Sequence, residues 1–226
     1  MAARTPHTWP WLAIGVTILA ALLTTSDAAS AWATATRIPS RELGLGWQAW
    51  TTHGVHVSAL HLLGSGLVWL MAGAAVERIS RGSLIALILA GAPAITWAAL
   101  VAEPEMGSYV GLSGLACACV AWLACAWLWS EQSHKRTRLL GAILLMAVGI
   151  RIGCDLLGNG RGWGLALNEA TAGDSVRVAR YAHLAGALAG ALIWFIYSGV
   201  QRAGLRHSAP ATIIPPRVPT HPTDTP

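Results

Sequence analysis

Charged residues are scarce in this sequence of 226 residues. Lys and Arg together number 15 and Asp and Glu number 10, so 11% of the chain is charged, against roughly 25% in soluble globular domains. So few charges could not cover a water-facing surface, and hydrophobic residues make up 54% of the chain. This composition excludes a soluble globular protein and a disordered one, and it indicates that lipid surrounds most of the chain.

The few charges leave long uncharged runs between them. Asp, Glu, Lys and Arg are absent from residues 5–26, 43–76, 82–102, 106–130 and 181–201. About 20 apolar helical residues cross the hydrocarbon core, so each of these runs can span a bilayer. A sixth segment, 139–157, is apolar apart from Arg151 and Asp155, whose spacing of four residues predicts an ion pair within one helix.

Helices are the expected spanning elements, because in lipid every backbone amide must be paired within its own segment. We predict an all-α membrane protein in which residues 1–200 form a single six-helix membrane domain. The expected helices cover residues 9–26, 54–76, 82–101, 110–129, 139–158 and 181–200. The first of them also fits a cleavable signal peptide, and we favour a retained span over cleavage.

Lys and Arg are distributed unevenly between the two sides of this predicted bundle. Nine fall on the side of the N-terminus and five on the opposite side, which predicts that the N- and C-termini are both cytoplasmic. The net charge of +5 therefore reflects topology and gives no reason to expect binding of nucleic acid. Residues 201–226 are expected to form a disordered cytoplasmic tail, since six prolines fall within 209–226.

Polar residues on three predicted helices meet in one layer. His56 and His61 fall in the first two turns of the second helix, Ser113 in the first turn of the fourth, and His183 in the first turn of the sixth. These three helices run in the same direction, so all four side chains are expected within about 10 Å of the outer helix ends. Ionisable or hydroxyl groups inside a span are costly and mark candidate functional sites.

Small residues predict close approach of the fourth and sixth helices. Each helix carries small side chains at intervals of four residues: Ser113, Cys117 and Ala121 on one, and Ala182, Gly186 and Gly190 on the other. Such ridges let two helix backbones pack together in lipid. Packed in this way, the two helices could bring the Ser113 hydroxyl to His183, whose imidazole would activate the serine as a nucleophile.

The same region could stabilise an oxyanion. Ser113 lies where the first N–H groups of a helix have no partner within the helix, and donors of this kind contribute roughly 3–4 kcal/mol each. Gly111 and Gly114 allow a turn and a close approach of substrate. His61 can add a side-chain donor, although a hydrogen bond to a neighbouring helix is an equally good interpretation of this residue.

Four motifs, in order along the chain, resemble the rhomboid family of intramembrane serine proteases. Residues 111–114 (GLSG) resemble its GxSG motif, residues 182–190 resemble its AHxxGxxxG helix, and His56, His61 and residues 75–78 resemble the signature of its second helix. The resemblance covers about residues 44–200. It implies that Ser113 is the nucleophile and His183 the general base, with His61 and His56 in oxyanion or supporting roles and no metal or organic cofactor.

The sequence departs from the family pattern at several positions. Ser65 replaces the usual Asn four residues after His61, Cys117 replaces a Tyr, and Gln48 follows Trp47 where the family has Arg. The absence of an added domain is similar to the rhombosortase branch, which processes C-terminal membrane anchors. The resemblance therefore implies a transmembrane protein as substrate, and a bacterial inner membrane location with the site towards the external face.

Other interpretations remain open at this stage. The chain could be an inactive rhomboid-like protein that binds membrane helices, or a haem or metal protein that uses His56, His61 and His183 as ligands. The glycine-rich loop 158–180 is a candidate lid over the site, and the loop 37–50 is a candidate interfacial segment. The four cysteines all fall in predicted spans and are interpreted as packing residues.

Overall fold

The computed structural model describes residues 9–25, 46–56, 58–104, 109–130, 133–157 and 179–207. All secondary structure in these ranges is helical. The elements are α1 (Trp11–Thr25), α3 (Gln48–Thr51), the 3-10 helix η1 (Thr52–Gly54), α4 (Ala59–Ile79), α5 (Arg81–Ala86), the π-helical turn η2 (Leu87–Gly91), α6 (Ala92–Ala102), α7 (Ser113–Trp129), α8 (Lys135–Leu157) and α10 (Arg180–His207). The predicted lid falls largely at residues 158–178, outside the described ranges.

Four helical stretches are long and apolar enough to cross a membrane: Ala59–Ile79, Arg81–Ala102, Lys135–Leu157 and Arg180–Ala203. Two further apolar helices, α1 and α7, have 15 and 17 residues, somewhat fewer than the roughly 20 that span the hydrocarbon core without help. The chain is therefore an integral membrane protein of all-helical architecture. The count of six spans and the orientation of the termini stay predictions.

Several predicted helix boundaries were wrong. The helix expected to start at residue 54 begins at Ala59, because the Ser58 hydroxyl accepts a hydrogen bond from the His61 N–H (3.1 Å) and caps the helix there. Residues 48–54, expected to lie mostly in a loop, form α3 and η1. The last helix continues to His207, so residues 201–207 are helical and do not belong to a disordered tail.

The third predicted span is a helix interrupted in the middle. Pro93 lacks an N–H and cannot bond to the carbonyl of Leu89, four residues earlier, and a π-helical turn, η2, precedes it. The indole N–H of Trp50 donates to this Leu89 carbonyl at 3.0 Å. The proline thus frees an acceptor that anchors the short helix α3 to the bundle.

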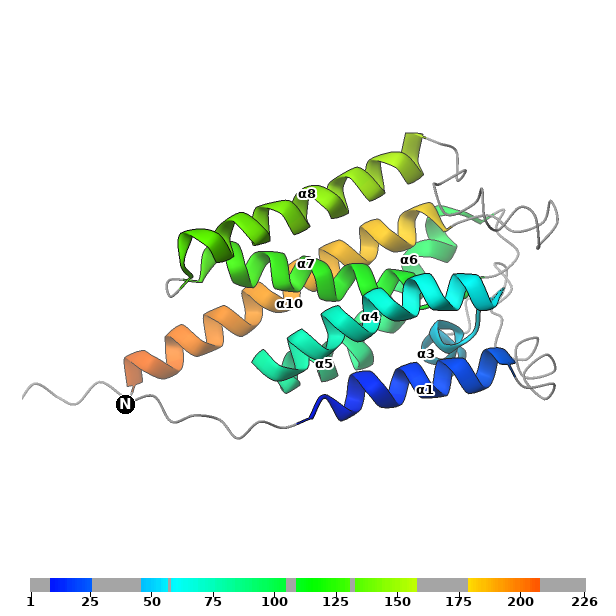
Figure 1. Cartoon of the computed structure of the whole chain (residues 1–226), viewed down its shortest axis with the longest axis horizontal. Coiled ribbons are helices and arrows are strands. Elements are labelled where there is room, and N and C mark those ends of the chain that lie inside the picture. The colour runs from blue at the N-terminus through cyan, green and yellow to red at the C-terminus, as the bar shows by residue number, and fades with distance from the viewer. Residues whose placement is uncertain are drawn as a thin grey trace, which may run out of the picture.

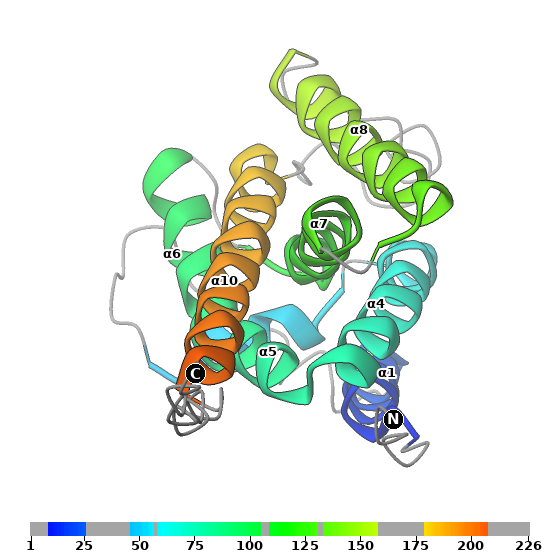
Figure 2. The ribbon, with the colours of Figure 1, turned by 90° about the vertical axis from the view of Figure 1, so that its left-hand side faces the viewer.

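Helix α7 occupies the centre of the bundle. Viewed from one end, it is surrounded by α4, α8, α10 and the α5–α6 unit (Figure 2), and it packs mainly against α10, α8 and α4. Most of its side chains are small and buried. Because α4, α7 and α10 all begin at the same end of the bundle (Figure 1), the fold brings their first turns together, as the sequence predicts.

The backbones of α7 and α10 touch. A Cβ atom built on Gly186 would lie 2.1 Å from the Gly114 carbonyl oxygen, and one on Gly190 would lie 2.0 Å from that of Ala118. The close approach that small residues predicted is therefore present. The ridge on α7 was assigned one residue out of register, since Gly114 and Ala118 make the contact and Ser113 and Cys117 lie on the adjacent, half-buried face.

Helix α1 is fastened to α4 through a buried carboxylate. Glu77 accepts hydrogen bonds from the backbone N–H groups of Leu12 (3.2 Å) and Ala13 (3.0 Å), and the Trp69 indole donates to the Ala13 carbonyl at 3.3 Å. A carboxylate at a helix N-terminus satisfies donors that have no partner within the helix and complements the helix dipole. These contacts dock the start of α1 against α4.

We expect Glu77→Gln to loosen this docking, since only one acceptor oxygen remains and the charge is lost. Hydrogen bonds to charged groups contribute about 1.5–3 kcal/mol each, so the variant should be about 1–2 kcal/mol less stable. Thermal unfolding in detergent micelles measures the loss. Arg78→Gln, which changes the exposed neighbouring residue, is the control, and equal melting temperatures for the two variants would contradict the assigned role of Glu77.

Candidate functional site

The turn before α7 requires a glycine. Gly111 has φ +116°, a conformation that residues with a side chain rarely adopt, and a Cβ at this position would lie 2.9 Å from His61 Cε1. The Gly111 N–H donates to the Thr52 carbonyl (3.1 Å), and its carbonyl accepts from the Tyr109 hydroxyl (3.3 Å). His53 Nδ1 also lies 3.2 Å from this carbonyl. The backbone that leads into Ser113 is therefore held on both sides.

Ser113 is the first residue of α7 and is half-buried. Its own N–H and the next two precede the first i→i−4 bond of the helix, which runs from the Ala116 N–H to the Leu112 carbonyl at 2.8 Å. None of these N–H groups has a partner within the helix, but that of Gly114 faces the Tyr109 hydroxyl oxygen. The N–H groups of Ser113 and Leu115 are therefore the candidates for binding a negatively charged oxygen next to the Ser113 hydroxyl. Gly114 keeps the adjacent backbone open to α10, because a side chain there would meet Ile95 and the Ala182 carbonyl.

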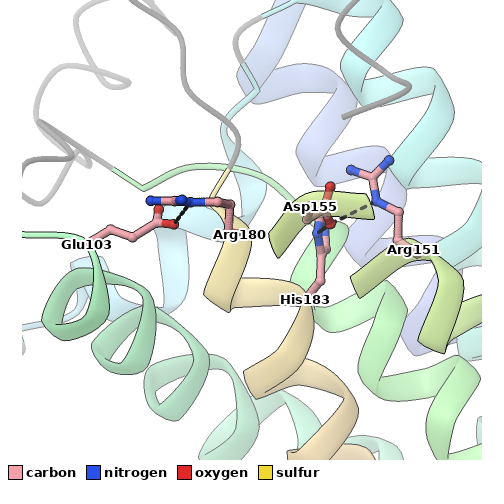
Figure 3. A network of polar contacts seen from close by, with 5 residues as sticks. All are labelled: Glu103, Arg151, Asp155, Arg180 and His183. Atoms are coloured by element: carbon pink, nitrogen blue, oxygen red, sulfur yellow. Dashed lines mark hydrogen bonds and ion pairs between the residues drawn. The ribbon is translucent and has the colours of Figure 1, made fainter. Parts of the chain in front are cut away.

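His183 lies in the first turn of α10 and is held by Asp155 of α8. Its Nδ1 is 2.6 Å from Asp155 Oδ2, and the same oxygen is 3.1 Å from Arg151 Nε (Figure 3). The ion pair predicted between Arg151 and Asp155 is thus confirmed, but the contact of Asp155 with His183 was not anticipated. A carboxylate oxygen can only accept, so Nδ1 carries the hydrogen and Nε2 is left free to accept a proton.

Ser113 and His183 are brought to adjacent places without direct bonding. Their backbone neighbours Gly114 and Ala182 are in contact, as a Cβ on Gly114 would lie 3.2 Å from the Ala182 carbonyl oxygen. Both side chains are among the described residues, and no hydrogen bond joins the Ser113 hydroxyl to the imidazole of His183. Hydrogen bonds between catalytic groups are frequently loose before substrate binds, so this arrangement is compatible with a working pair.

His56 was expected inside the second helix, but it lies before α4 and outside any helix. Burial lowers the pKa of His56 to about 3, so its ring is neutral. The Leu112 N–H donates to His56 Nε2 at 3.2 Å, which makes this nitrogen an acceptor and removes the Leu112 N–H from any oxyanion site. Ser65 Oγ lies 3.1 Å from the same nitrogen. His56, held by Ser65 of α4, therefore supports the turn before Ser113.

His61 lies beside His56 next to that turn. Its ring centroid is 5.2 Å from that of His56 in an edge-to-face arrangement, and its Cε1 and Nε2 atoms face Gly111. Its Nδ1 is buried without a hydrogen-bond partner among the described residues. A buried polar atom left unpaired is uncommon, and it leaves the His61 side chain uncommitted to structural bonding beside Gly111.

A second buried carboxylate lies at the same end of the bundle. Glu103, at the C-terminal end of α6, accepts from Arg180 Nε of α10 at 2.8 Å (Figure 3). This pair ties α6 to the start of the helix that carries His183, yet it does not touch the imidazole. Sequence reasoning missed it, because nothing in the spacing of two residues 77 positions apart indicates that they meet.

The described residues give no support to a centre in which several side chains hold a metal ion. In this part of the chain no three His, Cys, Asp or Glu side chains are grouped as ligands for a metal ion.

Comparison with known proteins agrees with this architecture. The family profile described as the Rhomboid domain matches residues 44–200, which is more than half of the chain. No curated protein matches the sequence. The matched region includes every residue discussed above for the turn before α7, together with Asp155 and His183. The chain therefore belongs to the rhomboid family.

Proposed function

We propose that this protein is an intramembrane serine endopeptidase in which Ser113 is the nucleophile and His183 the general base. The observation that carries the proposal is the meeting of α7 and α10 at their first turns. There the backbones next to the two residues are in contact, and His183 presents its free Nε2 with Nδ1 bonded to Asp155. Members of this family act on transmembrane substrates within the bilayer.

The reaction proceeds through a covalent intermediate. Ser113 Oγ attacks the carbonyl carbon of a peptide bond while His183 Nε2 takes the hydroxyl proton. The tetrahedral oxyanion is stabilised by N–H groups at the start of α7 that have no partner within the helix, with His61 as an additional donor. His183 then gives the proton to the leaving amine, and an ester of Ser113 remains. Water, deprotonated by His183, hydrolyses this ester and restores the serine.

The substrate would be a membrane protein cut in or next to its transmembrane segment. The bias of Lys and Arg towards the side of the N-terminus supports a position of Ser113 and His183 near the external face of the membrane, which for this protein would be a bacterial inner membrane. The small core, which resembles the rhombosortase branch, favours a C-terminal membrane anchor as the segment that is cut. Co-expression with single-span proteins anchored at either end tests this choice, and preferential cleavage of N-terminally anchored proteins would contradict it.

A fluorophosphonate probe tests the nucleophile directly, without knowledge of the substrate. We expect the purified protein in micelles to form one covalent adduct, and peptide mapping by mass spectrometry should place it on Ser113, because only a serine with an adjacent base reacts readily. Prior heat denaturation is the control and should abolish the reaction. No adduct with the folded protein, or an adduct on another serine, would contradict the proposed function.

A further inference from the structure

Among the residues that the structure describes, the buried carboxylate of Asp155 is bonded to His183 and Arg151 alone. Asp155 is fully buried, and its Oδ2 receives both His183 Nδ1 (2.6 Å) and Arg151 Nε (3.1 Å). Its Oδ1 has no hydrogen-bond partner in the described part of the chain. A buried carboxylate is costly unless it is paired, so the cation of Arg151 and the N–H of His183 together account for its presence.

We propose that Asp155 is a positioning residue for His183, which would make the site a Ser–His–Asp arrangement assembled from α7, α10 and α8. This inference rests on the proposed function. Asp155 acts through the imidazole and touches no substrate. By accepting the Nδ1 hydrogen it fixes the tautomer in which Nε2 is bare, and it stabilises the imidazolium that forms when Nε2 takes the Ser113 proton.

Arg151 has a separate part in this arrangement. It is four residues before Asp155 on α8, its side chain is about one-third exposed, and its Nε approaches the oxygen that His183 uses. The guanidinium pairs with the same carboxylate oxygen that accepts from His183, and this contact holds that oxygen in place beside Nδ1. Removal of Arg151 should therefore weaken the effect of Asp155 on His183 but not abolish it.

Asp155→Asn is the informative variant, because the amide can donate to Nδ1 and so favour the wrong tautomer of His183. We expect the rate of fluorophosphonate labelling of Ser113 to fall by at least about a hundredfold; loss of the equivalent carboxylate in a well-known triad costs about ten-thousandfold. Asp155→Glu should recover part of the rate, and Arg151→Gln should lose about tenfold. Glu103→Gln is the matched control, since it breaks another buried carboxylate–arginine pair at the same end of the bundle.

A second measurement does not depend on activity. In protein labelled with 15N-histidine, the His183 resonances, assigned by their loss in His183→Asn, should show a protonated Nδ1 and a bare Nε2. In Asp155→Asn the population with hydrogen on Nε2 should rise, whereas a merely structural role would lower the melting temperature without changing the tautomer. If Asp155→Asn fails to fold, the tautomer of His183 in the wild-type protein and the labelling rate of Asp155→Glu still test the positioning role.

The outcomes separate this inference from the proposed function. An unreactive wild-type protein would contradict the protease, and the tautomer measurement would still test the contact between Asp155 and His183. Wild-type reactivity retained in Asp155→Asn, or an equal loss in Glu103→Gln, would overturn the positioning role. A wild-type His183 with hydrogen on Nε2 would overturn it as well.

Discussion

Replacing Ser113 with alanine is expected to abolish cleavage of a co-expressed membrane substrate, with a loss of at least about a thousandfold, because no other group can form the acyl intermediate. His183→Asn should lose a similar amount, since the serine would keep its proton. Immunoblots of the substrate, with cut ends mapped by mass spectrometry, measure the effect. Ser198→Ala is the control: this exposed hydroxyl at the far end of α10 bonds only within its own helix, to the Phe195 carbonyl.

The double variant distinguishes a cooperating pair from two independent residues. If Ser113 and His183 act as a unit, the variant lacking both should be no worse than Ser113→Ala alone, because the second change removes a base with no nucleophile to serve. If the double variant instead shows the product of the two single losses in cleavage rate, His183 contributes independently of Ser113. Cleavage retained in Ser113→Ala at the same site would refute the nucleophile assignment outright.

Much of the fold could be predicted from the sequence, because the lipid imposes simple constraints. Uncharged runs of about 20 residues have few alternatives to helices, and motif order placed Ser113 and His183 at the starts of helices that proved to be neighbours. The boundaries were less predictable. No charged residue interrupts positions 54–58, whereas the start of α4 depends on a single capping hydroxyl, that of Ser58.

The contacts that pair distant residues could not be predicted, for a different reason. Glu77 bonds the first turn of α1 across 64 residues, and Asp155 reaches His183 across 28. The spacing of four residues from Arg151 to Asp155 is explained by an ion pair within one helix. The sequence therefore provides no reason to predict a second partner for Asp155. The register of the α7 ridge was equally hidden, because small residues occur all around that helix and no polar face marks the side that contacts α10.

Gly186→Ala is expected to damage both stability and activity by adding one methyl group. Its Cβ would lie 2.1 Å from the Gly114 carbonyl oxygen, about 1 Å closer than such atoms approach in proteins, and neither backbone can rotate away as a side chain could. Overpacking of this kind costs about 1–3 kcal/mol. The helices must separate, so thermal unfolding in micelles should occur at a clearly lower temperature than in the wild-type protein.

The activity loss should exceed what this destabilisation alone explains, because Gly114 is the residue next to Ser113. A displacement of about 1 Å between reacting groups can cost about a hundredfold in rate, so fluorophosphonate labelling of the folded variant should fall by about that factor. The Cβ added by Gly190→Ala would lie 2.0 Å from the Ala118 carbonyl oxygen. This variant should lose as much stability as Gly186→Ala but should label faster than Gly186→Ala, since Gly190 lies one turn further from Ser113. Gly199→Ala on the same helix meets nothing within 4 Å and should be neutral or slightly stabilising. If Gly186→Ala matched Gly199→Ala in both measurements, α7 and α10 could not be in backbone contact, and the placement of Ser113 beside His183 would lose its structural basis.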